Sequence, residues 1–186
     1  GKTIALITND DAGDNTGHAT VKNTTALNLA LSTIDGNFSG TATNGSISQT
    51  GNLNITGTAT FITTVNNSDI ILSQSGNVFG AQVTMQAGNG TNFAFGNITF
   101  VDSGAVKIET SAGTNADGDL LIDGSTDGAV GGNLNVTATT GDITQGVALA
   151  VTGTSTFVTS ANDATITLNT TTNAFTGALT ITTNDN

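Results

Sequence analysis

The stretch that most constrains the fold occurs twice, as Leu53-Asn54-Ile55-Thr56-Gly57-Thr58-Ala59-Thr60-Phe61 and as Leu149-Ala150-Val151-Thr152-Gly153-Thr154-Ser155-Thr156-Phe157. In the first copy, apolar and polar residues alternate on either side of a Thr-Gly-Thr turn, and the second copy keeps this turn and the large apolar residues at the first, third and last positions. A period of two is typical of a strand that buries one face, and glycine suits the corner between two strands. Each copy therefore predicts two short strands joined by a tight turn.

The repeat extends well beyond this stretch. Residues 37–90 align without gaps to residues 133–186, at an offset of 96 positions, with 20 identities in 54 pairs. Residues 1–36 and 91–132 match the repeat less well, so we expect divergent or inserted coils there. The sequence thus predicts one continuous segment over residues 1–186 rather than separate domains.

The two ends of the chain also resemble each other. Ile4-Ala5-Leu6-Ile7-Thr8-Asn9-Asp10 is similar to Leu179-Thr180-Ile181-Thr182-Thr183-Asn184-Asp185. The last residues re-enter the pattern that the first residues leave, as expected for part of a longer tandem array. We therefore expect the partners of this segment to be flanking repeats, or further copies of itself stacked end to end, with a host or matrix surface as a further candidate.

Short strands of this kind fit three all-β architectures, namely a sandwich, an antiparallel barrel and a β-solenoid. Asn-Gly and Asp-Gly dipeptides could mark hairpins and favour the antiparallel alternatives. Most expected strands have only three to five residues, however, and the chain has 8 Phe but no Trp or Tyr to fill a sandwich. The prediction is a parallel β-helix, a β-solenoid of about eight coils, with tandem β-sandwich domains as the alternative. The inward apolar residues would include Leu53, Ile55, Phe61, Ile70, Leu72, Phe79, Leu149, Val151, Phe157, Ile166, Leu168 and Phe175.

Composition excludes several classes of function. Charged residues make up 9% of the chain, the formal net charge is −11, and the only cationic side chains besides one His are 3 Lys. Binding of nucleic acid or of an anionic membrane surface needs Lys and Arg that are missing here. There is no run of 18 apolar residues, so no membrane insertion is expected. With no Cys, disulfides and thiolate metal sites are excluded as well.

The order of motifs resembles a known repeat. Gly132-Asn133-Leu134-Asn135-Val136-Thr137-Ala138, Gly141-Asp142-Ile143-Thr144-Gln145, the second copy of the opening stretch, Ile166-Thr167-Leu168-Asn169 and Asn173-Ala174-Phe175-Thr176-Gly177-Ala178-Leu179 follow one another. This series is similar to the repeat of giant filamentous-haemagglutinin-type surface proteins of Gram-negative bacteria, and residues 37–85 show the same order.

The resemblance implies a fold, a right-handed parallel β-helix, and it implies a role as well. It implies an exported structural segment on the cell surface, giving length and stiffness for cell adhesion, biofilm or filament formation. The signal peptide would lie outside these residues. A calcium- or glycan-dependent binding module on the same β-solenoid is the alternative.

An acidic stretch is the candidate for such a binding site. Asp117, Asp119, Asp123 and Asp127 supply carboxylates at spacings that could hold calcium in a corner insertion, although Leu120 and Thr126 replace residues that an EF-hand needs. Their Asp-Gly pairs also suit ordinary turns. Residues 9–15 form a weaker candidate of the same kind. No other cofactor is expected.

The chain offers little for catalysis. Lys107 and Glu109 are two residues apart on an expected strand, where they could share a face beside Asp102, but a solvent-facing ion pair accounts for them. His18 is the only histidine and is expected to be an exposed loop residue. Polysaccharide-cleaving β-helices need clustered carboxylates and usually a cation beside them, so we expect no enzyme.

Overall fold

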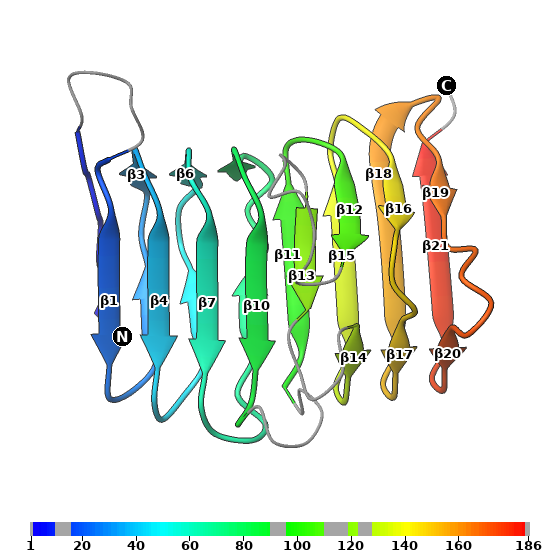
Figure 1. The fold of residues 1–186 in the computed structure, drawn as a ribbon, viewed down its shortest axis with the longest axis horizontal. Helices are drawn as coiled ribbons and strands as arrows, with labels where there is room; N and C mark the ends of the chain where they lie inside the picture. Colours follow the sequence, from blue (N-terminus) through cyan, green and yellow to red (C-terminus); the bar gives the residue numbers. More distant parts are fainter. Residues whose placement is uncertain (1, 10–15, 90–95, 110–118, 123–127, 185–186) are drawn as a thin grey trace.

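The computed structural model describes residues 2–9, 16–89, 96–109, 119–122 and 128–184. These residues form strands joined by turns and bends, and no helix occurs among them, hence none that could cross a membrane. The chain winds as a right-handed coil whose strands lie across the long axis of the molecule (Figure 1). The predicted parallel β-solenoid is confirmed.

Two broad sheets run the length of the molecule and face each other. The eight-stranded sheet contains, in spatial order, β1 (Ala19–Asn23), β4 (Phe38–Ala42), β7 (Ala59–Thr63), β10 (Val83–Ala87), β13 (Asp119–Ile122), β12 (Val106–Glu109), β16 (Ile143–Gln145) and β19 (Ile166–Thr167). The seven-stranded sheet contains β2 (Leu27–Leu29), β5 (Ile47–Gln49), β8 (Ile70–Leu72), β11 (Ile98–Asp102), β15 (Leu134–Ala138), β18 (Ser155–Asn162) and β21 (Leu179–Asn184).

Two small sheets close the coils. The first contains β3 (Ser32–Ile34), β6 (Leu53–Ile55) and β9 (Val78–Phe79), and the second contains β14 (Ala129–Val130), β17 (Ala150–Val151) and β20 (Ala174–Phe175). They lie along opposite edges of the molecule, the first at the top and the second at the bottom of Figure 1. All of the strand pairs in the described part of the chain are parallel, which excludes the antiparallel and tandem-sandwich alternatives.

The repeat therefore changes face halfway along the solenoid. The five-residue strands of the first half, β4 and β7, lie in the eight-stranded sheet, whereas their counterparts 96 residues later, β15 and β18, lie in the seven-stranded sheet. The change begins at β11, a five-residue strand that stacks on the three-residue strand β8. β13 then fills the eight-stranded sheet between β10 and β12. The solenoid has about six turns rather than eight, because the coils here are longer: the stacked residues Ile70, Ile98 and Leu134 are 28 and 36 positions apart, against 20 for Leu27 and Ile47.

The strands bury one face, as the alternating sequence predicts. In β4, β7, β10 and β15, the first, third and fifth residues are buried and the other two are partly exposed. A ladder of aromatic rings follows the axis through the first coils, from Phe38 to Phe61, Phe79 and Phe100, with ring centroids 5.3, 6.3 and 5.3 Å apart. The ladder continues from β9 to β11, so the core is unbroken where the repeat changes face.

Nine of the twelve predicted core residues are fully buried, from Leu53 to Phe157. The other three, Ile166, Leu168 and Phe175, are only partly buried, although they pack against the same core. They belong to the last coil, which other coils cover on one side only. Position in the stack, rather than residue type, sets their exposure.

Some turn residues also repeat their conformation. Asn67 and Asp163 occupy equivalent positions 96 residues apart, and both have φ of 60°. Asn and Asp tolerate this left-handed conformation better than most residues because their short side chains bond locally. At another corner, Gly45 has φ of 148°, and a Cβ there would lie 2.8 Å from the backbone nitrogen of Ala26. Such corners keep successive coils close together.

Candidate functional site: the contacts that join successive coils

The residues predicted to bind calcium are only partly covered by the structure. Asp117, Asp123 and Asp127 lie outside the described residues, as do residues 10–15 of the weaker candidate. Asp119 is described, and it lies buried on β13 opposite Lys107 of β12. Within the described ranges, no three acidic, His or Cys side chains gather in a way that could hold a metal ion. Calcium binding by these residues stays a prediction.

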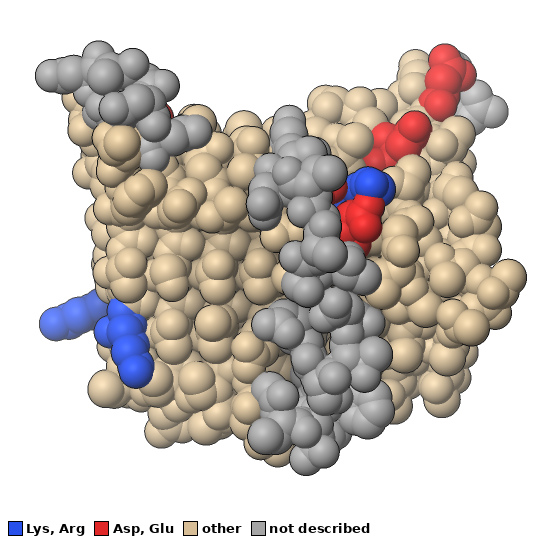
Figure 2. Space-filling model, in the orientation of Figure 1, with Lys and Arg blue, Asp and Glu red and all other residues tan. Residues whose placement is uncertain are grey.

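Lys107 and Glu109 form an ion pair on the outer face of β12. The hydrogen bond to Glu109 and the negative charge of that residue raise the pKa of the Lys107 ammonium, and the charge of Asp119 adds to this effect. The Lys107 side chain is 51% exposed, so the pair is a surface feature, as expected. Figure 2 shows opposite charges side by side at this place. Asp102 does not share their face, because it is buried on β11 in the other broad sheet.

One corner of the solenoid carries a ladder of polar side chains along the axis. At four of the seven strands of the seven-stranded sheet, β5, β8, β11 and β15, the side chain of the residue before the strand accepts the backbone N–H of the equivalent residue in the next coil. Asp69 N–H donates to Ser46 Oγ (3.0 Å), Asn97 N–H to Asp69 Oδ1 (2.8 Å), Asn133 N–H to Asn97 Oδ1 (2.8 Å), and Thr154 N–H to Asn133 Oδ1 (2.8 Å). The ladder crosses the change of face without interruption, so it joins the two halves of the molecule.

His18 belongs to a similar corner on the eight-stranded sheet. Its side chain is exposed, as predicted, and Nδ1 accepts the backbone N–H of Asn37 at 2.8 Å. Asn37 Oδ1 in turn accepts the backbone N–H of Thr58 at 2.9 Å. His18 therefore takes the place that Asn or Asp takes at other corners, which is a structural role.

A buried pair of amide side chains connects three coils in the first half. Asn77 is fully buried and exchanges two hydrogen bonds with Gln49, one in each direction, at 2.8 and 3.0 Å. Asn77 Oδ1 also accepts the backbone N–H of Leu53 (3.0 Å), and its Nδ2 donates to the carbonyl of Val101 (3.1 Å). Both Asn77 amide atoms are thereby satisfied inside the core, which offsets the cost of burying them.

The same device recurs 96 residues later. Gln145 and Asn173 exchange two hydrogen bonds at 2.9 and 2.8 Å, and Asn173 Oδ1 accepts the backbone N–H of Leu149 at 2.9 Å. Sequence analysis did not assign a role to these four amides. The signal that could have found them was the identity of Gln and Asn in both copies at positions where an apolar core is expected.

The arrangement of these polar side chains can hold successive coils together. Figure 2 shows one broad face on which few charged side chains occur, apart from lysines near one end and a small group over β12 and the last coils. The described polar contacts run from coil to coil along the axis. These polar contacts therefore join successive coils.

The comparisons with known proteins agree with a tandem repeat. A family model described as repeats of unknown function (DUF5649) matches residues 16–86 and again residues 83–182. The two matches meet at β10, the last strand before the repeat changes face. No curated protein and no solved structure matches the chain.

Proposed function

The chain belongs to this family of repeats, and from that premise we propose that it is a structural segment of an extracellular bacterial surface protein. The proposed role of this segment is to provide length and stiffness, so that an adhesive part of a filament is held away from the cell. The resemblance to filamentous-haemagglutinin-type proteins supports a location on the cell surface and a part in adhesion or biofilm. The proposal includes no catalytic role.

The observation that carries the proposal is the continuity of both broad sheets along the axis. The seven strands of one sheet stack at about 4.8 Å each, which gives a segment of about 30 Å. Backbone hydrogen bonds run between all of these coils, as at Ile70 N–H to Asn97 O (3.0 Å) and Ile98 N–H to Asn133 O (2.9 Å). Because the two bonds lie on either side of the change of face, stiffness is maintained through it.

Surface composition supports the same role. The described strands present outward-facing Thr, Ser and Asn between the buried apolar residues, and the net charge of the whole chain is −11. A net charge far from zero keeps proteins soluble and opposes non-specific association. Such a surface suits a spacer that works among many neighbouring copies.

The proposal is tested by replacing these repeats in the protein that carries them. An unrelated β-solenoid with the same number of coils, inserted in their place, should restore the adhesion that deletion of the repeats removes. A failure of the replacement, where the native repeats succeed, would assign a binding role to the repeats themselves. An antibody against the segment should label intact cells, and labelling only after lysis would overturn the surface location.

A further inference from the structure

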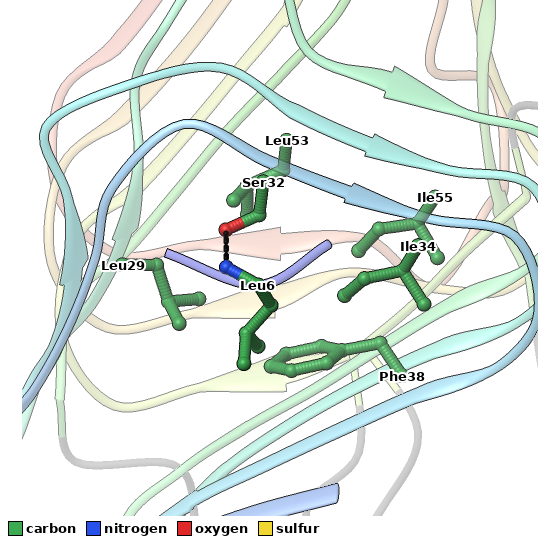
Figure 3. A pocket seen from close by; sticks show the side chains of 7 residues that line it. All are labelled: Leu6, Leu29, Ser32, Ile34, Phe38, Leu53 and Ile55. Atoms are coloured by element: carbon green, nitrogen blue, oxygen red, sulfur yellow. Dashed lines mark hydrogen bonds between the residues drawn. The ribbon is translucent and has the colours of Figure 1, made fainter. Parts of the chain in front are cut away.

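Residues 2–9 cover the outer edge of the first coil. Ile4 N–H donates to Asn28 O (2.9 Å), and Ala30 N–H donates to Ile4 O (2.8 Å). Further along, Thr33 N–H donates to Leu6 O (2.9 Å), and Leu6 N–H donates to Ser32 Oγ (3.1 Å). Figure 3 shows Leu6 lying over Leu29, Ile34 and Phe38, so this segment covers the end of the core. We call the strands beneath it the β2–β3 edge.

β21 has the same pattern and lies at the opposite end of the same broad sheet. Residues 4–9 align with residues 179–184, with identical Thr and Asn at the last two positions, and the side chains of Leu179 and Ile181 correspond to those of Ile4 and Leu6. Those of Ile4 and Leu6 are packed against the core, whereas Leu179 is 43% and Ile181 50% exposed. Within the part of the chain that the structure describes, no surface packs against the second pair as the core packs against the first.

The backbone of β21 is oriented to receive such a partner. Ser155 N–H donates to Ala178 O (2.8 Å), so the groups of Ala178 point toward β18. Orientation alternates along a strand, and the N–H and C=O of Leu179 therefore point to the free edge. In the first coil, the N–H and C=O of Ile4 both point to the β2–β3 edge. The matched residues present their backbone groups in the same direction.

At one other place in the chain, a strand of five residues extends past the short strand on which it stacks. At the change of face, β11 pairs with β8, with Ile98 opposite Ile70, and Ser103 N–H then donates to Asn77 O beside β9 (2.9 Å). Residues 4–9 likewise reach from a short strand of the broad sheet, β2, to the corner that follows it, although Ile4 lies opposite the last residue of β2 and Ile98 opposite the first residue of β8. This packing is therefore compatible with the coil dimensions of the repeat.

We propose that β21 binds the β2–β3 edge of a second copy of this chain, in the place that residues 4–9 hold in that copy. In this arrangement Leu179 lies opposite Leu29, and Thr182 lies opposite Thr33, because Ile4 pairs with Leu29 and Ile7 with Thr33. Leu179 and Ile181 become buried on the core of the second copy. This inference rests on the proposed structural function and adds the partner and its register.

Residues 4–9 compete with the incoming strand. A tethered segment acts at an effective concentration in the millimolar range, so the unaltered chain is expected to associate only weakly. Two variants of the 186-residue chain separate the roles of its two ends. Ile4→Asp with Leu6→Asp should release the segment and tighten association at least tenfold, as measured by sedimentation velocity at 0.3 M salt, where charge repulsion is screened. Adding Leu179→Asp and Ile181→Asp should abolish the gain.

A matched control uses an exposed apolar residue away from both ends. Val78 on β9 is 43% exposed, as Leu179 is, and Val78→Asp in the released variant should leave association unchanged. Circular dichroism verifies that each variant is folded. A released variant that is folded and stays monomeric at 100 µM would overturn the proposal.

Cross-linking tests the register without releasing the segment. The chain has no Cys, and Thr33 and Thr182 are exposed residues on β3 and β21, at opposite ends of the molecule. Thr33→Cys with Thr182→Cys should form disulfide-linked dimers and longer chains under mild oxidation, whereas Thr33→Cys with Thr180→Cys should form several-fold fewer. Equal yields, or none, would overturn the register and leave the replacement experiment on cells unaffected.

Discussion

Substitution of Asn77 by Ala tests whether the buried amide pair holds the coils together. The change removes four hydrogen bonds and leaves three partners inside the core, namely the amide of Gln49, the N–H of Leu53 and the carbonyl of Val101. A buried polar group left unpaired costs about 1–3 kcal/mol. Because Gln49 keeps a bond to the carbonyl of Gly51, we expect a total loss of about 4 kcal/mol.

The repeat supplies a matched control, since Asn173 makes the same contacts with Gln145 and Leu149. Asn173 is only half-buried in the last coils, so water can replace the lost bonds. Asn173→Ala should therefore cost about 1–2 kcal/mol. The difference between the two variants isolates burial, because the residue removed is the same in both.

Amide hydrogen exchange is the appropriate assay, because the coils of a solenoid need not unfold together. Leu53 and Leu149 each donate their N–H to the Asn that is removed, so each amide reports on its own copy. Protection of Leu53 should fall by about 10³-fold in Asn77→Ala, which corresponds to about 4 kcal/mol. Losses that agree within about 0.5 kcal/mol at both sites would refute the argument from burial.

Three further substitutions probe close packing, the aromatic ladder and the surface ion pair. Gly96→Ala should lower the free energy of unfolding by about 1–3 kcal/mol, because its Cβ would lie 1.9 Å from a backbone carbonyl oxygen. Gly104 has no neighbour nearer than 3.5 Å to its Cβ position, so Gly104→Ala should be within about 1 kcal/mol of the parent. Equal urea midpoints for the two variants would contradict this. Phe61→Ala should lower the free energy of unfolding in urea by about 3–5 kcal/mol, because the ring of Phe61 is fully buried. Phe175→Ala should lower it clearly less, because the ring of Phe175 is only partly buried. A larger loss of stability at Phe175 would count against the ladder. Lys107→Gln should be less stable than the parent below pH 10.5, and the difference in stability should vanish at higher pH. The reason is that a cation whose pKa is raised by folding stabilises the fold only while it is protonated. A difference in stability that persists at pH 12 would exclude the ion pair as its source.

Much of the local structure could be predicted from the sequence, because it depends on neighbouring residues. Alternation placed strands on either side of the first Thr-Gly-Thr turn, where Leu53–Ile55 and Ala59–Thr63 lie, and it assigned their inward residues correctly. The candidate site was harder to predict from the sequence. Gln49 and Asn77 occupy inward positions that a hydrophobic pattern reserves for apolar residues, and only their mutual hydrogen bonds, across 28 residues, make that burial favourable.

What the sequence by itself determined is therefore the strand type, its inward face, the tight corners and the order of the repeat. Only the tertiary structure decided which sheet each strand joins. Equivalent strands such as β4 and β15 lie in opposite sheets, because parallel pairing uses backbone groups that every residue has, and both sheets offer the same aliphatic interior. The change of face depends on contacts between coils, such as Asn97 with Asp69 and Phe100 with Phe79, which join residues more than twenty positions apart.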